Sequence, residues 1–152
     1  MRDHNVIATY AKNVMDFVIG SVLASIFGYA LAHGTHPLAW GRDEGQHDAF
    51  FFHVAFQATA ATIVSGAMAE RTAVLAYVLI ATGTSTIYCL AVRWTWGCEP
   101  WLAQHGFHDF AGSGVVHLLG GCAPLTGSAV VGARSGRWEK AQAHEFVPHS
   151  IP

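Results

Sequence analysis

Four long apolar segments constrain this chain more than any other feature of its sequence. They cover approximately residues 14–32, 49–69, 72–92 and 111–131. Each is about 20 residues long, a length that crosses roughly 30 Å of bilayer hydrocarbon as an α-helix. Backbone groups in lipid must be hydrogen-bonded internally, and a helix meets that requirement. The sequence therefore predicts an all-α, polytopic membrane protein with four transmembrane helices embedded in a lipid bilayer.

The composition agrees with a membrane environment. Of the 152 residues, 52% are hydrophobic and only 12% are charged, whereas soluble domains carry about a quarter charged residues. Four such segments in so short a chain also disfavour a soluble helical bundle. The formal net charge of −2 gives no indication of nucleic-acid binding. Cys89, Cys98 and Cys122 form no CxxC pair, so neither a disulfide framework nor a zinc site is indicated.

The basic residues between and beyond these segments indicate an orientation. If the N-terminus, the turn near residue 70 and the C-terminal tail share one side, that side has six basic residues and the other has two. Cytoplasmic loops are enriched in Lys and Arg, so both ends of the chain are expected to be cytoplasmic. The first group is Arg2, Lys12, Arg71, Arg134, Arg137 and Lys140, and the second is Arg42 and Arg93.

Small residues on two of the predicted helices favour close packing, which in lipid depends on such residues. One row is spaced by four residues and two pairs are spaced by seven, so each set shares a helix face. These faces could meet inside a four-helix bundle or could meet helices that this chain does not contain. The row is Ala58, Thr62 and Gly66, and the pairs are Gly120 with Gly127 and Gly121 with Ser128.

Two polar residues open and interrupt the fourth apolar segment. Asp109 stands where a carboxylate caps free amides at the start of a helix. His117 follows eight residues later, which is about 12 Å deeper along a helix axis. Polar side chains at such depth face the bundle interior or a water path. Two interpretations of His117 stay open: pore chemistry, or a structural hydrogen bond to a neighbouring helix.

The remaining polar residues of the segments lie near helix ends. Glu70 is expected to make an end-of-helix contact with its neighbour Arg71. His53, close to the outer end of the second segment, is expected to reach interfacial water.

Three aromatic residues lie near the predicted outer ends of two helices. Phe52 and Phe56 are four residues apart and share a helix face, and Trp96 lies near the outer end of the third segment. Such residues pack against each other, but together they could also form a cation–π site for a small cation. Both interpretations are kept.

Enzyme signatures are absent from the sequence. It contains no GxSxG, no HExxH and no phosphate-binding glycine loop, so no enzymatic activity and no cofactor are predicted. His33 with His36 and His105 with His108 each form HxxH in a predicted loop, without an acidic or Cys ligand at fixed spacing. That is a weak signal, and no metal site is assigned.

Several stretches resemble the ammonium transporter family, which includes methylammonium permeases and Rhesus glycoproteins. The second helix of that family resembles KNVMDFVIGSVLASIFGYALAHG, and the third resembles FFHVAFQATAATIVSGAMAER. The Trp-containing end of the fourth helix and the start of the fifth resemble WTWGCEPWLAQHGFHDFAGSGVVHLLGG. The DFAGSGVVH string matches the transporter branch better than the Rhesus branch. The resemblance extends from about Asn5 to Trp138, and HSIP at 149–152 is similar to the lead-in to a sixth helix.

The resemblance implies a role for five residues. Phe56 and Trp96 correspond to the outer gate and cation-recruitment site, and Phe52 to an aromatic residue lining the same vestibule. Asp109 corresponds to the acid that supports this site, and His117 to the first of two pore histidines.

The resemblance also implies the context of the complete protein, which is ammonium or methylammonium transport by a homotrimer of eleven-helix subunits in the plasma membrane. This chain matches only helices two to five, so it lacks the second pore histidine. Arg93 and His53 stand where relatives usually have His and Gln. The alternatives are a truncated subunit or regulator that does not conduct, and a membrane metal-binding protein or enzyme.

Overall fold

A computed structural model describes residues 2, 5–38 and 45–146, and helices joined by loops make up these ranges. Four of its helices are long and apolar enough to span a membrane, which confirms the predicted all-α, multi-pass architecture. The spans are Val6–His33, Gln46–Met68, Val74–Thr95 and Ser113–Val131. Arg42 and residues 149–152, which entered the expectations above, lie outside the described residues.

Two of the spans contain a π-helical segment. The first span joins α1 (Val6–Leu23) to α2 (Tyr29–His33) through a π-helix at Ala24–Gly28. The last span begins with a π-helix at Ser113–Leu118 and continues as α6 (Leu119–Val131). The other elements are α3 (Gln46–Met68), α4 (Val74–Thr95), the short α5 (Trp101–Gln104) and a 3-10 helix at Lys140–Phe146.

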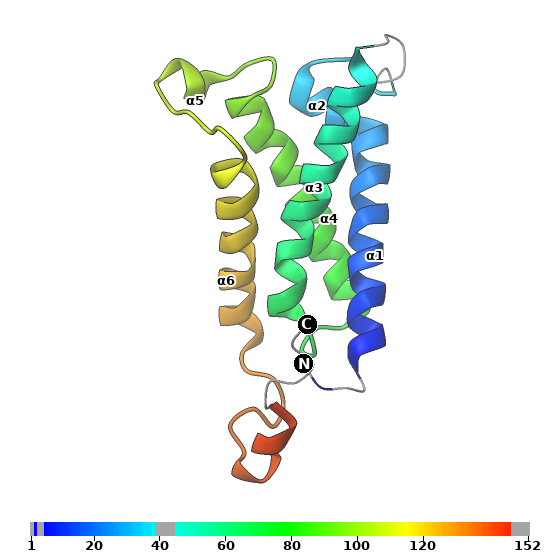
Figure 1. Ribbon diagram of the computed structural model, residues 1–152, viewed down its shortest axis with the longest axis vertical. Coiled ribbons are helices and arrows are strands. Elements are labelled where there is room, and N and C mark those ends of the chain that lie inside the picture. The colour runs from blue at the N-terminus through cyan, green and yellow to red at the C-terminus, as the bar shows by residue number, and fades with distance from the viewer. Residues whose placement is uncertain (1, 3–4, 39–44, 147–152) are drawn as a thin grey trace.

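Helix α3 lies at the centre of the bundle and packs against α1, α4 and α6 (Figure 1). Small residues permit these approaches. A Cβ atom added to Gly120 would lie 2.9 Å from Ile63 Cδ1, and one added to Gly127 would lie 2.8 Å from Met68 Cε. A Cβ added to Gly121 would meet nothing within 4 Å. The Gly120 and Gly127 pair is therefore the face of α6 that meets α3.

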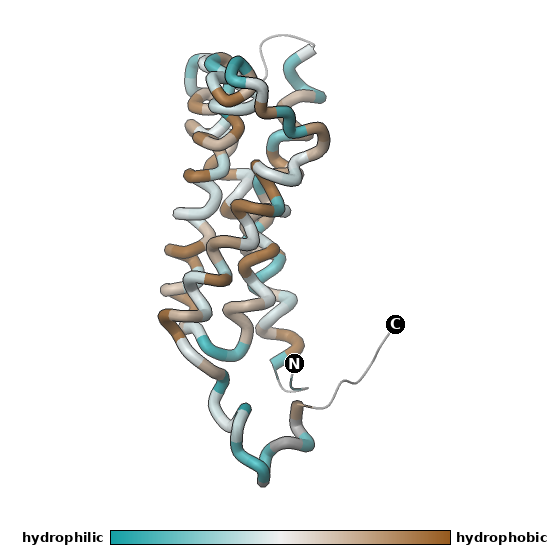
Figure 2. Tube along the Cα trace, turned by 90° about the vertical axis from the view of Figure 1, so that its left-hand side faces the viewer, coloured by the Kyte–Doolittle hydropathy of each residue, from teal (hydrophilic) through white to brown (hydrophobic). Residues whose placement is uncertain are grey.

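The two ends of the bundle differ from its middle. Hydrophilic residues gather towards the ends, and apolar residues run along the helices between them (Figure 2). The 3-10 helix lies at the same end as the start of α1, and α5 lies at the opposite end (Figure 1). This division gives the molecule two polar surfaces separated by the length of the bundle.

Candidate functional site

Three aromatic residues meet at the end of the bundle that carries α5. The rings of Phe52 and Phe56 are stacked with centroids 4.2 Å apart. The Trp96 ring lies 6.2 Å from each of them, and Trp96 itself is the C-cap of α4. Phe52 is 52% exposed, whereas Phe56 and Trp96 are half-buried against the core. The sequence placed these residues near two helix ends, and the structure brings them into one cluster.

The carboxylate of Asp109 holds the start of the last span. Its two oxygens accept backbone N–H groups at 2.7–2.9 Å, two on each oxygen. The first helical N–H groups have no partner within the helix, so the carboxylate satisfies four donors that would otherwise be unpaired. The four donors are Gly112, Ser113, Gly114 and Val115. Asp109 is thus the helix cap that its position in the sequence predicted.

These backbone contacts keep Asp109 charged. Burial alone would raise the pKa of its carboxyl group, but the N–H groups of Val115, Gly112, Gly114 and Ser113 lower that pKa below its ordinary value. Hydrogen bonds to the ionised form favour that form. The site therefore carries a fixed negative charge at neutral pH.

Asp109 also connects to the aromatic cluster through its main chain. The indole Nε1 of Trp96 donates a hydrogen bond of 2.7 Å to the Asp109 carbonyl oxygen. Gly112, at φ +88°, packs closely against the Phe56 ring, because a Cβ atom there would lie 3.2 Å from Phe56 Cε1. The conformation of the 109–112 loop therefore fixes both rings.

His117 lies within the π-helix at Ser113–Leu118, and its backbone N–H bonds to the Gly112 carbonyl at 3.0 Å. His117 is exposed on the surface of the bundle. In the part of the chain that the structure describes, the imidazole has no hydrogen-bond partner. π-Helical turns occur frequently at functional sites. The structural hydrogen bond to a neighbouring helix, which the sequence left open, is not formed within these four helices.

The interior holds a polar cluster that the sequence did not predict. His53 is 1% exposed, so the expectation that it reaches interfacial water is wrong. Its ring packs edge-on against His33 and Tyr88, with centroids 5.5 and 5.3 Å away, and its Nε2 lies 3.9 Å from Cys89 Sγ. These partners belong to α2 and α4, and nothing in the local sequence shows that His53 faces them.

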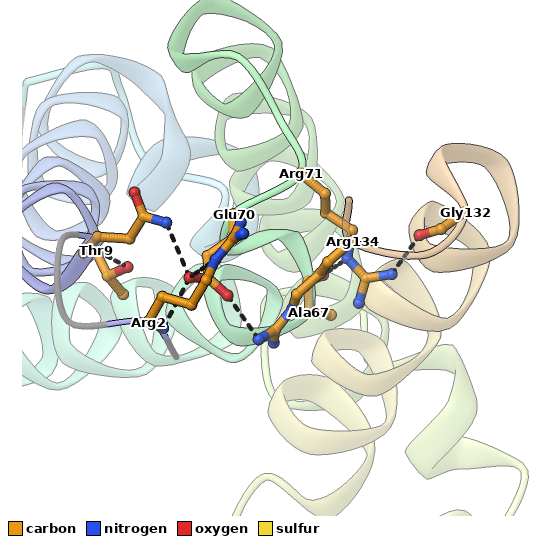
Figure 3. A network of polar contacts seen from close by, with 8 residues as sticks. Arg2, Thr9, Ala67, Glu70, Arg71, Gly132 and Arg134 are labelled. Carbon is orange, nitrogen blue, oxygen red and sulfur yellow. Dashed lines mark hydrogen bonds and ion pairs between the residues drawn. The ribbon is translucent and has the colours of Figure 1, made fainter. Parts of the chain in front are cut away.

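At the opposite end, Glu70 does not pair with Arg71 as expected. Its side chain is fully buried and accepts bonds from the backbone N–H of Arg2 and from Asn5 Nδ2, at 2.8 and 2.9 Å. Arg134 Nη1 completes the set at 2.8 Å (Figure 3). Arg71 turns away and donates to the Gly132 carbonyl at 2.6 Å. Glu70 itself has φ +64°, a left-handed conformation that directs its side chain and that of Arg71 apart.

The histidines of the two HxxH pairs form no metal centre in the part of the chain that the structure describes, and His33 belongs to α2 rather than to a loop. The His33 ring is tilted by 37° against that of Tyr29 with centroids 4.4 Å apart, and His105 Nδ1 lies 2.7 Å from the Trp101 carbonyl oxygen. Over residues 2, 5–38 and 45–146, no group of three or more His, Cys, Asp or Glu side chains is arranged to hold a metal ion.

Comparison with known proteins identifies a single family. The family model described as the Ammonium Transporter Family matches residues 1–152. A Synechocystis sp. protein provisionally named an ammonium transporter is 40% identical over 153 residues, covering 89% of this chain and 34% of that protein. Ammonium transporter Amt2 of Archaeoglobus fulgidus is 36% identical over 99% of this chain and 36% of its own length. A rice protein named ammonium transporter 1 member 1 is 34% identical, covering 93% and 33%. The chain thus spans about a third of the length of the curated relatives it matches.

Proposed function

The chain belongs to the ammonium transporter family, a family of transporters rather than enzymes, and we propose that it forms part of a transmembrane path for ammonium. It supplies the outer recruitment site and one pore-lining histidine, and helices outside this chain complete the pore. Ammonium or methylammonium is the substrate, and the complete protein is a homotrimer in the plasma membrane with both ends of this segment cytoplasmic.

The aromatic cluster of Phe52, Phe56 and Trp96 carries the proposal. A cation over an aromatic face gains about 0.5–1 kcal/mol at exposed sites and about 2 kcal/mol when desolvated. The Trp96 N–H is already bonded to the Asp109 carbonyl, so a cation would contact a ring face of the cluster rather than this edge. The partial exposure of Phe52 leaves the cluster open to water.

Asp109 supports recruitment in two ways. It fixes the loop that positions Trp96 and Phe56, and its charge favours a cation near the cluster. Because its oxygens are occupied by four backbone N–H groups, it acts as a positioning residue rather than as a direct ligand.

Below the cluster, the cation must shed its charge or its water, because a bare ion in hydrocarbon is costly. His117 lies in the same span, after the Asp109 cap. Its imidazole has no hydrogen-bond partner on the four described helices. It either carries the proton or hydrogen-bonds neutral ammonia, together with a group from outside this chain.

Methylammonium uptake by the complete protein, expressed from the full reading frame that contains this chain, tests the proposal. We expect Trp96→Leu and His117→Ala each to reduce uptake at least tenfold. The matched controls are Trp94→Leu, a Trp in the last turn of α4 outside the cluster, and His105→Ala, a histidine in the loop. If uptake were unchanged in both test variants at equal expression, these residue assignments would be wrong.

A further inference from the structure

The bundle end opposite the aromatic cluster gathers several arginines around one pocket. The pocket has a volume of about 400 Å³ and lies between the α3–α4 turn and the segment that follows α6. The described residues that line it are Arg71, Ala133, Arg134, Arg137, Trp138 and Phe146. The lining thus combines three guanidinium groups with two aromatic rings and, among these described residues, contains no acid.

The arginines are held in place by contacts that leave donors available. Arg71 bonds to the carbonyls of Ala67 and Gly132, and Arg134 bonds to Glu70 (Figure 3). A guanidinium group has five N–H donors, so neither contact set uses all of them. Both side chains are therefore fixed in position while they keep N–H groups for a ligand.

Arg137 is held differently. Its Cζ lies 5.1 Å from the centroid of the Trp138 ring and 5.6 Å from that of the Phe146 ring. Among the residues that the structure describes, its guanidinium group has neither an ion-pair nor a hydrogen-bond partner. Stacking of this kind orients the planar group without using its donors. Arg137 is the side chain of the pocket whose charge is least compensated.

The charged side chains that line the pocket are all positive. Glu70 is the one carboxylate that these arginines contact within the described residues, and it is shared between Arg2 and Arg134. Arg71 and Arg137 make no ion pair there. Arginine forks match the oxygens of phosphate in geometry and charge, so a phosphate group suits this pocket better than a cation or a neutral sugar.

We propose that this pocket, formed by Arg71, Arg134, Arg137 and Trp138, binds a phosphate-bearing anion at the membrane surface, at the opposite end from the aromatic cluster. Most residues that line the pocket come shortly after the end of α6 at Val131, and Trp138 among them is 79% exposed. Trp side chains favour the headgroup level, and basic pockets at helix ends bind anionic headgroups. A lipid headgroup and free phosphate share this chemistry.

Binding measurements on the purified, delipidated complete protein test this site and distinguish the two sources. The probes are inorganic phosphate, short-chain phosphatidylglycerol and phosphatidylcholine of equal chain length, each titrated by calorimetry. We expect phosphatidylglycerol to bind more tightly than phosphatidylcholine. Arg137→Gln should weaken its binding about fivefold, because one basic side chain near an anionic headgroup contributes about that factor. Lys140→Gln, an exposed basic residue at the same end that does not line the pocket, is the matched control and should leave binding unchanged.

The outcomes separate clearly. Phosphate binding that depends on Arg137 supports the site and shows that the free anion suffices. Binding of phosphatidylglycerol alone, with the same dependence, supports the site and assigns it to a lipid. Equal binding of both lipids without phosphate binding overturns the proposal, and so does binding that Arg137→Gln leaves unaltered. Arg137 is outside the Glu70 network, so the fold of Arg137→Gln should persist, and thermal unfolding without ligand checks this.

Discussion

At the residue scale, the Asp109 carboxylate stabilises the start of the last span, because four backbone N–H groups donate to its two oxygens. Asp109→Asn replaces one acceptor oxygen by an NH₂ group that faces two donors. We expect a loss of about 1–3 kcal/mol in the free energy of unfolding and a shift in tryptophan fluorescence, measured in detergent. Asp48→Asn, an exposed acid in the first turn of α3, is the control. Equal losses in both variants would contradict the cap.

Glu70 gives a pH dependence of defined sign. Burial acts to raise its pKa, but hydrogen bonds from Asn5 and Arg2 and the charge of Arg134 outweigh it and lower the pKa from 4.5 to about 2. The folded pKa is below the unfolded one, so this carboxylate stabilises the fold above pH 4.5, and the contribution is lost as the pH falls towards 2.

Replacement of Glu70 should remove that dependence. Glu70→Gln is expected to lower stability at pH 7 by about 2 kcal/mol, since Arg2 and Arg134 lose a buried charged acceptor. Thermal unfolding followed from pH 7 to pH 3 measures both effects. Glu99→Gln, which breaks the exposed ion pair with Arg93 at the other end, should change stability by less than about 1 kcal/mol. A wild-type pH profile retained in Glu70→Gln would refute the assignment.

At the element scale, the contact between α3 and α6 depends on which of two adjacent glycines faces the partner helix. A Cβ atom at position 120 would lie 3.1 Å from the Ala60 carbonyl oxygen, a backbone atom that cannot move aside. Gly120→Val should therefore separate the helices and cost about 1–3 kcal/mol in stability. Gly121→Val should be nearly neutral, because a Cβ there meets nothing within 4 Å. Thermal unfolding of the two variants tests this, and similar melting temperatures would argue against it.

The sequence predicted the elements well because helix formation in lipid depends on local length and hydropathy. It could not predict that the first span begins at Val6, since residues 6–13 mix polar and apolar types. The helix persists there because Lys12 Nζ reaches the Thr72 carbonyl at 3.2 Å and Asn13 accepts a bond from Ser65. Contacts between residues so distant in sequence leave no local signal.

The same limit explains which site residues could be predicted. The cap at Asp109 is a local pattern, and the structure forms it. The spacing of Phe52 and Phe56 gave their shared face, whereas Trp96 joins them only through packing of α3 against α4. Burial of His53 and the ion pairs of Glu70 depend on residues more than 20 positions away in the chain, so sequence patterns misassigned both.

For the whole molecule, the two polar ends have separate chemistry. One end has the aromatic cluster and the Asp109 cap, and the other has the Glu70 network and the arginine pocket. All four spans separate them, so a ligand at one end cannot contact the other directly. The proposed cation site and the proposed anion site lie at opposite ends, which agrees with the uneven distribution of basic residues along the sequence.

The last prediction concerns which side of the membrane each end of the bundle faces. Cys98 is exposed just after Trp96, and Lys140 is exposed at the arginine end. With Cys122 replaced by Ala, Cys98 should react with a membrane-impermeant maleimide on intact cells, because the end with fewer basic residues faces outward. In a background with Cys98→Ser and Cys122→Ala, Lys140→Cys should react only after the membrane is opened. The reverse pattern would place the aromatic cluster inside the cell, where it would act at the exit of the path rather than at its entrance.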